Sequence, residues 1–242
     1  MSSVIESGRA SSSTASRCAG RLVVVSPHCD DAVFGCGELL AERPGSTVIT
    51  VFAGRPEHGV PLTDWDAAAG FGEGDDVMGY RRAEDRAALA GLGARPRWLP
   101  FRDAQYGVPV GADTVVAGLA AAVRTCRPDV VAIPLGLFHE DHKTTHEAGL
   151  RLARRWPQLT WILYADALYR CIDGLVEERL ARLRDAGLVP VPLPPAPPPG
   201  RCEELKRHAV ACYGSQLRAL SGAGRSGHDD VFEPERYWRL PT

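Results

Sequence analysis

Residues 22–31 spell LVVVSPHCDD. The apolar run at its start, rich in β-branched valine, predicts a buried strand over Leu22–Ser26. That strand runs directly into His28, Asp30 and Asp31. In open α/β sheets, ligands bind outside the carboxyl ends of the strands. This stretch therefore predicts the first strand of such a sheet and one side of a functional site.

Short apolar runs and longer amphipathic stretches alternate through the rest of the chain. Further strands are predicted at Thr47–Phe52, Arg97–Phe101, Val130–Pro134 and Thr160–Ala165. Helices are predicted around Gly35–Glu42 and at Val77–Leu92, Thr114–Cys126, His142–Arg155 and Glu203–Leu220. This alternation predicts an α/β fold in a single domain, Rossmann-like, with a mostly parallel sheet and helices on both faces.

Three segments fall outside this pattern. Residues 1–20 are rich in Ser, Ala and Gly and lack the apolar core of a signal peptide, so we expect a disordered tail before a domain at 21–242. Residues 53–76 are glycine-rich and without periodicity, which predicts a long loop of the kind that is often functional. Residues 190–200 predict a stiff proline-rich connector.

The composition excludes several classes of protein. The 242 residues carry a formal net charge of −2 with both signs interspersed, which gives no indication of a nucleic-acid partner. No apolar run is long enough to span a bilayer. Seven scattered cysteines without a CxxC pair favour reduced thiols over a disulfide framework or a thiolate zinc site. We expect a cytoplasmic protein.

A second polar cluster follows the strand predicted at Val130–Pro134. His139, Asp141 and His142 begin five residues beyond its end, so both clusters are expected at the same edge of the sheet. A catalytic zinc site needs three His or carboxylate ligands and an open position for water. It also needs a carboxylate base and a hydrogen-bond donor for the developing oxyanion. The two clusters together hold all of these groups.

The paired clusters resemble the PIG-L/LmbE-like N-deacetylases. The PHxDD motif of that family is present at residues 27–31, and its HxDH motif at residues 139–142. The resemblance extends to residues 50–54, 81–85 and 92–93 and to the last helix, and so covers roughly residues 21–240. Either motif alone is weak, but the pair in this order and spacing is specific.

The resemblance implies a role for each polar residue. It makes His28, Asp31 and His142 the ligands of zinc, or of another divalent ion such as Fe²⁺. Asp30 becomes the general base and His139 the electrophilic or acid partner, with Asp141 as the residue that orients His139. Arg81 and Asp103 match positions that contact substrate.

The sequence departs from the family pattern at Cys29, where many members have proline, and at Ala32, where many have glutamate. Neither position belongs to the implied ligand set. Both departures weaken the assignment of a substrate, whereas the implied chemistry is unaffected. We expect Cys29 to be a small buried apolar residue rather than a thiolate ligand.

Several positions also have a purely structural interpretation. Taken alone, the first cluster is typical of a helix N-cap, and the two histidines of the second are typical of a solvated loop. Arg81 fits an ordinary helix-face pair with Asp85, and Asp103 a turn. His146 lies four residues after His142, a spacing that allows a zinc pair, although the family pattern disfavours it. The remaining candidates are Trp65 and Phe71, as lid aromatics or loop anchors, and Lys206, Ser215 and Gln216, which we expect to fasten the last helix.

Three functions remain open at this stage. The first is hydrolysis of an N-acetyl amide, with an N-acetylglucosamine-type conjugate as the implied substrate. The second is metal-dependent hydrolysis of another amide or of a phosphoester, which the lack of a glycine-rich phosphate loop disfavours. The third is a non-catalytic sugar-binding relative, which would have no need to keep Asp30 and His139. The sequence does not identify the substrate or the oligomeric state.

Overall fold

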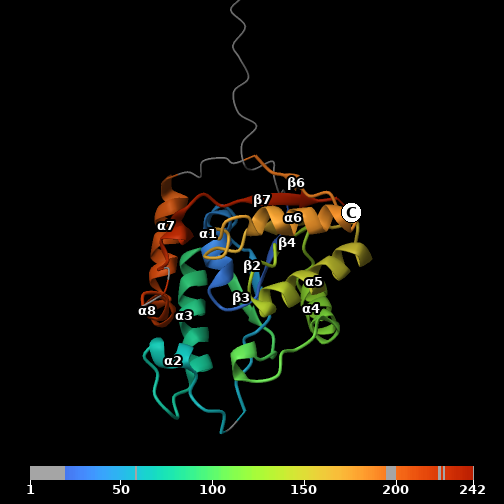
Figure 1. Cartoon of the computed structure of the whole chain (residues 1–242). Coiled ribbons are helices and arrows are strands. Elements are labelled where there is room, and N and C mark those ends of the chain that lie inside the picture. Colours follow the sequence, from blue (N-terminus) through green and yellow to red (C-terminus); the bar gives the residue numbers. More distant parts are fainter. Residues whose placement is uncertain (1–19, 58, 195–199, 223–224, 226, 242) are drawn as a thin grey trace, which may run out of the picture.

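A seven-stranded sheet forms the centre of the computed structural model, which describes residues 20–57, 59–194, 200–222, 225 and 227–241. The strand order is β3-β2-β1-β4-β5-β7-β6 (Figure 1). The strands from β3 to β5 pair in parallel, while β7 runs antiparallel to both of its neighbours. The order 3-2-1-4-5 is that of doubly wound α/β folds, so the predicted fold class is confirmed. The bounds are β1 Leu22–Ser26, β2 Thr47–Thr50, β3 Arg95–Trp98, β4 Val130–Pro134, β5 Thr160–Tyr164, β6 Val191–Pro192 and β7 Tyr237–Leu240.

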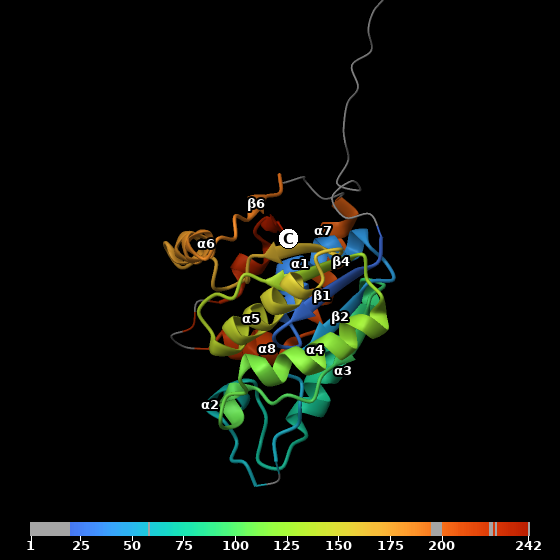
Figure 2. The same cartoon turned by 90° about the vertical axis from the view of Figure 1, so that its right-hand side faces the viewer.

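Helices cover both faces of the sheet because successive strand residues point to opposite sides. Val23 and Val25 of β1 pack toward α4, α5 and α6, whereas Leu22 and Val24 pack toward α1, α3 and α7. Figure 2 turns the α4 and α5 side toward the viewer. The helices are α1 Asp31–Glu42, α2 Asp64–Ala68, α3 Val77–Gly91, α4 Ala112–Cys126, α5 Glu140–Arg155, α6 Leu175–Asp185, α7 Gly200–Ala211 and α8 Gly214–Leu220, with short 3₁₀ turns at Ala104–Tyr106 and Asp229–Phe232.

The predicted strands agree best where they are most deeply buried. The strands at Leu22–Ser26 and Val130–Pro134 have the predicted bounds. The third strand is shifted toward the N-terminus of the chain, so that it begins at Arg95 and ends at Trp98. Beyond β2, Phe52 forms only an isolated bridge with Pro100.

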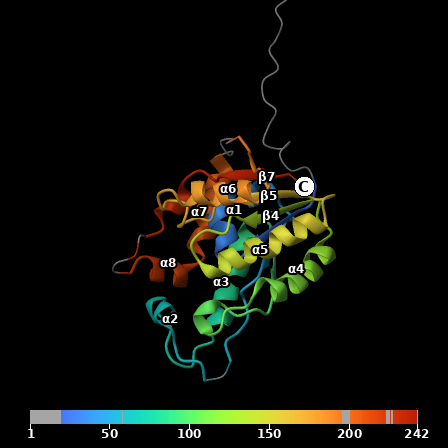
Figure 3. The same cartoon turned by 45° about the vertical axis from the view of Figure 1, so that its right-hand side comes forward.

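The predicted loop at 53–76 contains a short helix. Thr63 caps α2 by accepting the backbone N–H of Asp66 through Oγ1 at 3.1 Å. Trp65 donates through Nε1 to Gln216 Oε1 at 3.0 Å, which fastens α2 to α8 (Figure 3). The geometry therefore favours the loop-anchor interpretation of Trp65 and the fastening role expected of Gln216.

The C-terminal third differs most from the prediction. The single helix expected at 203–220 is broken into α7 and α8 at Tyr213, whose hydroxyl lies 2.9 Å from Asp85 Oδ1. The prediction missed α6 and β7. It also missed β6, which lies within the segment predicted to be a proline-rich connector. Residues 195–199 of that connector and residues 1–19 of the predicted tail lie outside the described residues. None of the helices in the described part of the chain is both long and apolar enough to cross a membrane.

A buried ion pair holds α1, the helix that begins at the functional site. The backbone of α1 is kinked at Cys36, so its second half starts with unsatisfied N–H groups. Glu235 accepts the N–H groups of Glu38 and Leu39 at 2.8 and 3.2 Å. Its charge is matched by Lys206 at 2.9 Å, and the two side chains are 4% and 1% exposed. Lys206 thus fastens α7 to α1, as expected.

We predict that Glu235→Gln destabilises the fold by about 3–5 kcal/mol, because it leaves the Lys206 cation buried without a counter-charge. The matched control is Glu203→Gln on the exposed face of α7, where loss of the pair with Arg207 should cost at most about 0.5 kcal/mol. Denaturant unfolding of both variants measures the difference. Equal midpoints would show that the pair has no special role.

Candidate active site

The two predicted clusters meet at the carboxyl edge of the sheet. His28 follows β1, Asp31 is the first residue of α1, and His142 lies in the first turn of α5. Asp31 Oδ2 lies 3.2 Å from His28 Nδ1 and 3.2 Å from His142 Nε2. One ligand atom from each of these three residues lies within 4.8 Å of the other two. The structure thus brings together the three residues predicted to bind the metal.

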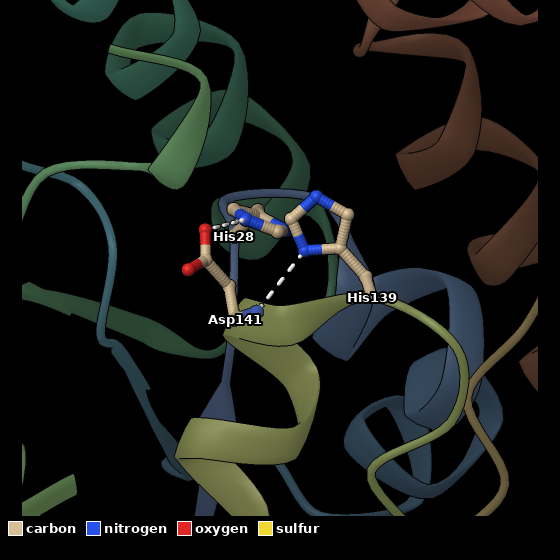
Figure 4. Close-up of side chains that lie close together, drawn as sticks. All are labelled: His28, His139 and Asp141. Carbon is tan, nitrogen blue, oxygen red and sulfur yellow. Dashed lines mark hydrogen bonds and ion pairs between the residues drawn. The ribbon is translucent and has the colours of Figure 1, made fainter. Parts of the chain in front are cut away.

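The outward nitrogen of each histidine contacts a carboxylate. His28 Nε2 lies 3.0 Å from Asp141 Oδ2 (Figure 4), and His142 Nδ1 lies 2.5 Å from Asp166 Oδ1. Histidines that bind metals characteristically hold their second ring nitrogen this way, which sets the orientation of the ring. The inward nitrogens are therefore already aimed at the shared position beside Asp31.

The charges of the cluster fit a cation. Burial alone would lower the pKa of each histidine, but the surrounding carboxylates raise the pKa of His28 well above its usual range and that of His142 to about 9. Despite the same burial, the histidines hold the pKa of Asp31 well below its usual range. A site with this surplus of carboxylate favours a positive charge at its centre. Metal binding at such a site displaces protons from the ligands.

His139 begins α5 as its N-cap. Its Nδ1 accepts the backbone N–H of Asp141 at 3.2 Å (Figure 4), so a neutral ring carries its proton on Nε2. The contact between these two residues therefore runs through the Asp141 backbone, while the Asp141 carboxylate lies against His28 and accepts the N–H of Ala104 at 3.0 Å. That Asp141 orients His139 stays a prediction.

In the described chain, a metal could also be held by His28 with His139 and Asp141, besides the set that contains Asp31 and His142. Asp30 lies beside the cluster but belongs to neither set. Burial, followed by the neighbouring Asp31 carboxylate, raises the pKa of Asp30 to about 6. A carboxylate with a pKa close to neutral pH is suited to accept a proton during catalysis. Its predicted role as a base is compatible with this position.

Arg81 and Asp103 lie next to the cluster. Both are buried, Arg81 Nη1 lies 3.7 Å from Asp103 Oδ2, and the same oxygen lies 3.7 Å from His28 Nε2. Asp85, the alternative partner of Arg81, instead accepts the indole N–H of Trp98 at 2.6 Å. Arg81 therefore faces the site. Contact of either residue with substrate stays a prediction.

His146 and Cys29 are both buried outside the candidate ligand sets. His146 Nδ1 lies 2.9 Å from the carbonyl oxygen of Pro134, so this nitrogen is directed at the backbone of β4. Burial raises the pKa of the Cys29 thiol, which favours its neutral form. This environment fits the expectation that Cys29 is a small apolar residue.

Asp166 is a residue of the site that the sequence analysis missed. It follows β5, and its second carboxylate oxygen accepts the backbone N–H groups of Gly136 and Leu137 at 2.9 and 3.3 Å. One carboxylate thus holds both His142 and the turn that leads from β4 to α5. Extending the search for polar residues to the end of the fifth predicted strand would have found it.

We predict that Asp166→Asn weakens metal binding by about 10–100-fold, because the amide keeps the shape of the side chain but loses the charge behind His142. Competition with a chelator measures the affinity directly and needs no substrate. Asp113→Asn, at a position whose side chain is 92% exposed, is the matched control and should bind the metal as the wild type does. Unchanged affinity in Asp166→Asn would remove this carboxylate from the metal site.

Two curated deacetylases are similar to this chain in sequence. Over 151 residues, the chain is 35% identical to a 1D-myo-inositol 2-acetamido-2-deoxy-alpha-D-glucopyranoside deacetylase of Rhodococcus erythropolis, covering 53% of this chain and 51% of the relative. It is 32% identical over 191 residues to the 2'-N-acetylparomamine deacetylase of Streptomyces fradiae, covering 71% and 65%. The aligned region thus spans about half to two thirds of these relatives.

A solved structure extends the similarity over nearly the whole fold. A triple mutant of a deacetylase from the teicoplanin biosynthetic pathway superposes with a TM-score of 0.76 and 26% identity, covering 91% of this chain and 97% of that one. The family described as GlcNAc-PI de-N-acetylase matches residues 23–153, a range that includes both polar clusters. This chain therefore belongs to the PIG-L family.

Proposed function

We propose that this protein hydrolyses the N-acetyl amide of an acetylated amino sugar conjugate. The observation that carries the proposal is the convergence of His28, Asp31 and His142 on one position. To Asp30 and His139 we assign catalytic roles rather than metal binding. We assign zinc, or another divalent ion such as Fe²⁺, to this position. When bound, such an ion supplies Lewis-acid activation of water and of the amide carbonyl.

Asp30 serves as the general base. Its carboxylate takes a proton from the attacking water as the water oxygen forms a bond to the acyl carbon. When the carbon–nitrogen bond breaks, the same proton passes to the amine nitrogen. The products are acetate and a free amine, so that one water is consumed and no other reactant is needed.

His139 serves as a hydrogen-bond donor to the acyl oxygen. Because the Asp141 backbone N–H occupies Nδ1, the proton of the neutral ring lies on Nε2. Burial, followed by the nearby His28 and His142, lowers the pKa of His139, which favours this neutral form. A donor that is already oriented stabilises negative charge as it develops on oxygen.

The substrate class is inferred from relatives and from the polar groups beside the metal position. The two curated relatives are named for a 2-acetamido-2-deoxy-glucopyranoside of inositol and for 2'-N-acetylparomamine. We assign the binding of sugar hydroxyl groups to Arg81 and Asp103, because this pair lies next to His28. A small acetylated amino sugar conjugate is therefore the proposed substrate. We propose the cytoplasm as the place of the reaction.

We predict that the metal-loaded protein releases equal amounts of acetate and amine from at least one N-acetylglucosamine conjugate. Asp30→Asn should keep its metal but lose about 10²–10⁴-fold in rate, because it removes a base and not a ligand. Acetate release across a panel of conjugates, with metal content measured by elemental analysis, tests both points. Turnover of only phosphoesters or simple amides would refute the amino-sugar assignment, and loss of metal in Asp30→Asn would refute the role of Asp30.

We predict that His139→Ala and His139→Asn both lower kcat by about 10²–10³-fold. Asparagine is a good N-cap, so it retains the start of α5 while removing the Nε2 donor. Initial rates at saturating substrate, together with thermal stability, separate the two roles. Recovery of activity in His139→Asn alone would show that His139 only caps the helix.

A further inference from the structure

Phe138 occupies an unusual backbone position beside the site. Its φ is +51°, in the left-handed region that disfavours bulky residues, and the N–H of His139 closes a three-residue turn by donating to the Leu137 carbonyl at 2.7 Å. The residue is nevertheless 60% exposed. The fold thus places a large and mostly exposed apolar residue at a backbone position that bulky side chains disfavour.

The surrounding structure holds this turn in place. The backbone N–H groups of Gly136 and Leu137 donate to Asp166, and the Gly136 carbonyl accepts from Arg179. On the other side, His139 caps α5. Strained residues persist where their neighbours over-determine the conformation, and they cluster at sites that bind ligands.

Tyr169 forms the second half of an aromatic surface. Its ring stacks on Phe138 with centroids 5.3 Å apart and meets the edge of His142 with centroids 5.1 Å apart. Asp230 holds the backbone on one side of Tyr169 by accepting the N–H of Leu168 at 2.7 Å, and pairs with Arg170 on the other side at 3.1 Å. Tyr169 is half-buried, and its ring lies next to a candidate metal ligand.

We propose that Phe138 and Tyr169 form a platform that binds the C–H face of the sugar ring carrying the scissile acetamide. This inference rests on the proposed function and adds the means by which the ring is held. Aromatic faces bind flat, C–H-rich surfaces. The platform adjoins His139 and His142, so a ring lying on it has its acetamide within reach of the reacting groups. Of the two aromatics that the sequence offered as lid residues, Trp65 is engaged with Gln216 and Phe71 packs against Tyr80 with ring centroids 5.4 Å apart.

Substitutions of Phe138 separate the contribution of its ring to substrate binding from the effect of the strained backbone on stability. Phe138→Ala and Phe138→Gly should both raise KM about tenfold with little change in kcat, and Phe138→Tyr should restore the wild-type KM. Glycine adopts positive φ without strain, so Phe138→Gly should melt at a higher temperature than Phe138→Ala. A purely structural Phe138 would lose stability and leave KM unchanged. The matched control is Val189→Ala, at an apolar residue that is 56% exposed after α6, which should leave KM unchanged.

Calorimetric binding distinguishes failure of this proposal from failure of the proposed function. The probes are N-acetylglucosaminyl inositol and, as an acetamide without a sugar ring, N-acetylethanolamine. The wild type should bind the glycoside about tenfold more tightly than Phe138→Ala does, with no such difference for the small amide. If the wild type binds the glycoside more tightly but releases no acetate from it, the proposed platform stands and the proposed deacetylase activity is rejected. Equal binding of the glycoside by the two proteins, no binding by the wild type, or an equal loss for both probes would overturn the platform.

Discussion

The site depends on the neutralisation of buried carboxylates by two histidines. Asp31 lies between the inward nitrogens of His28 and His142, while Asp141 and Asp166 lie behind the outward ones. Buried charges persist only when they are paired or bind a metal. This balance places the ring nitrogens around one position and explains why the site favours a cation there.

Asp166 links this charge balance to the shape of the site. One of its oxygens contacts His142, and the other accepts two N–H groups of the turn before α5. The same turn raises Phe138 toward solvent and presents His139 at the start of the helix. The proposed metal position, the proposed donor and the proposed aromatic platform therefore share a single support, which is a buried side chain at the end of β5.

The supports outside the site follow the same pattern of buried polar pairs. Glu235 and Lys206 join α1 to α7, and Glu84 joins α3 to Ser215 at the start of α8. These contacts bring the C-terminal helices against the face of the sheet from which α1 carries Asp31 to the site. The last residues of the chain thus stabilise the first functional segment, although they contribute none of the candidate catalytic groups.

Local pattern by itself determined much of this protein. The apolar runs at Leu22–Ser26 and Val130–Pro134 were sufficient to predict two central strands, because a strand buried on both faces has an almost continuous apolar sequence. The polar residues that follow each run were sufficient to predict that His28, Asp31 and His142 meet, since parallel strands end at one edge. Short elements such as α2 and the antiparallel strand β7 left no comparable pattern.

Tertiary structure alone decided which partner each polar group takes. Asp141 is adjacent to His142 in sequence, yet its carboxylate contacts His28, 113 positions away. Asp166 contacts His142 only because β5 lies beside β4, and Phe138 meets Tyr169 for the same reason. The sequence specifies which groups reach the edge of the sheet, whereas the order of the strands and the turns between them select the contacts. Those contacts depend on distances in space, which spacing along the chain does not encode.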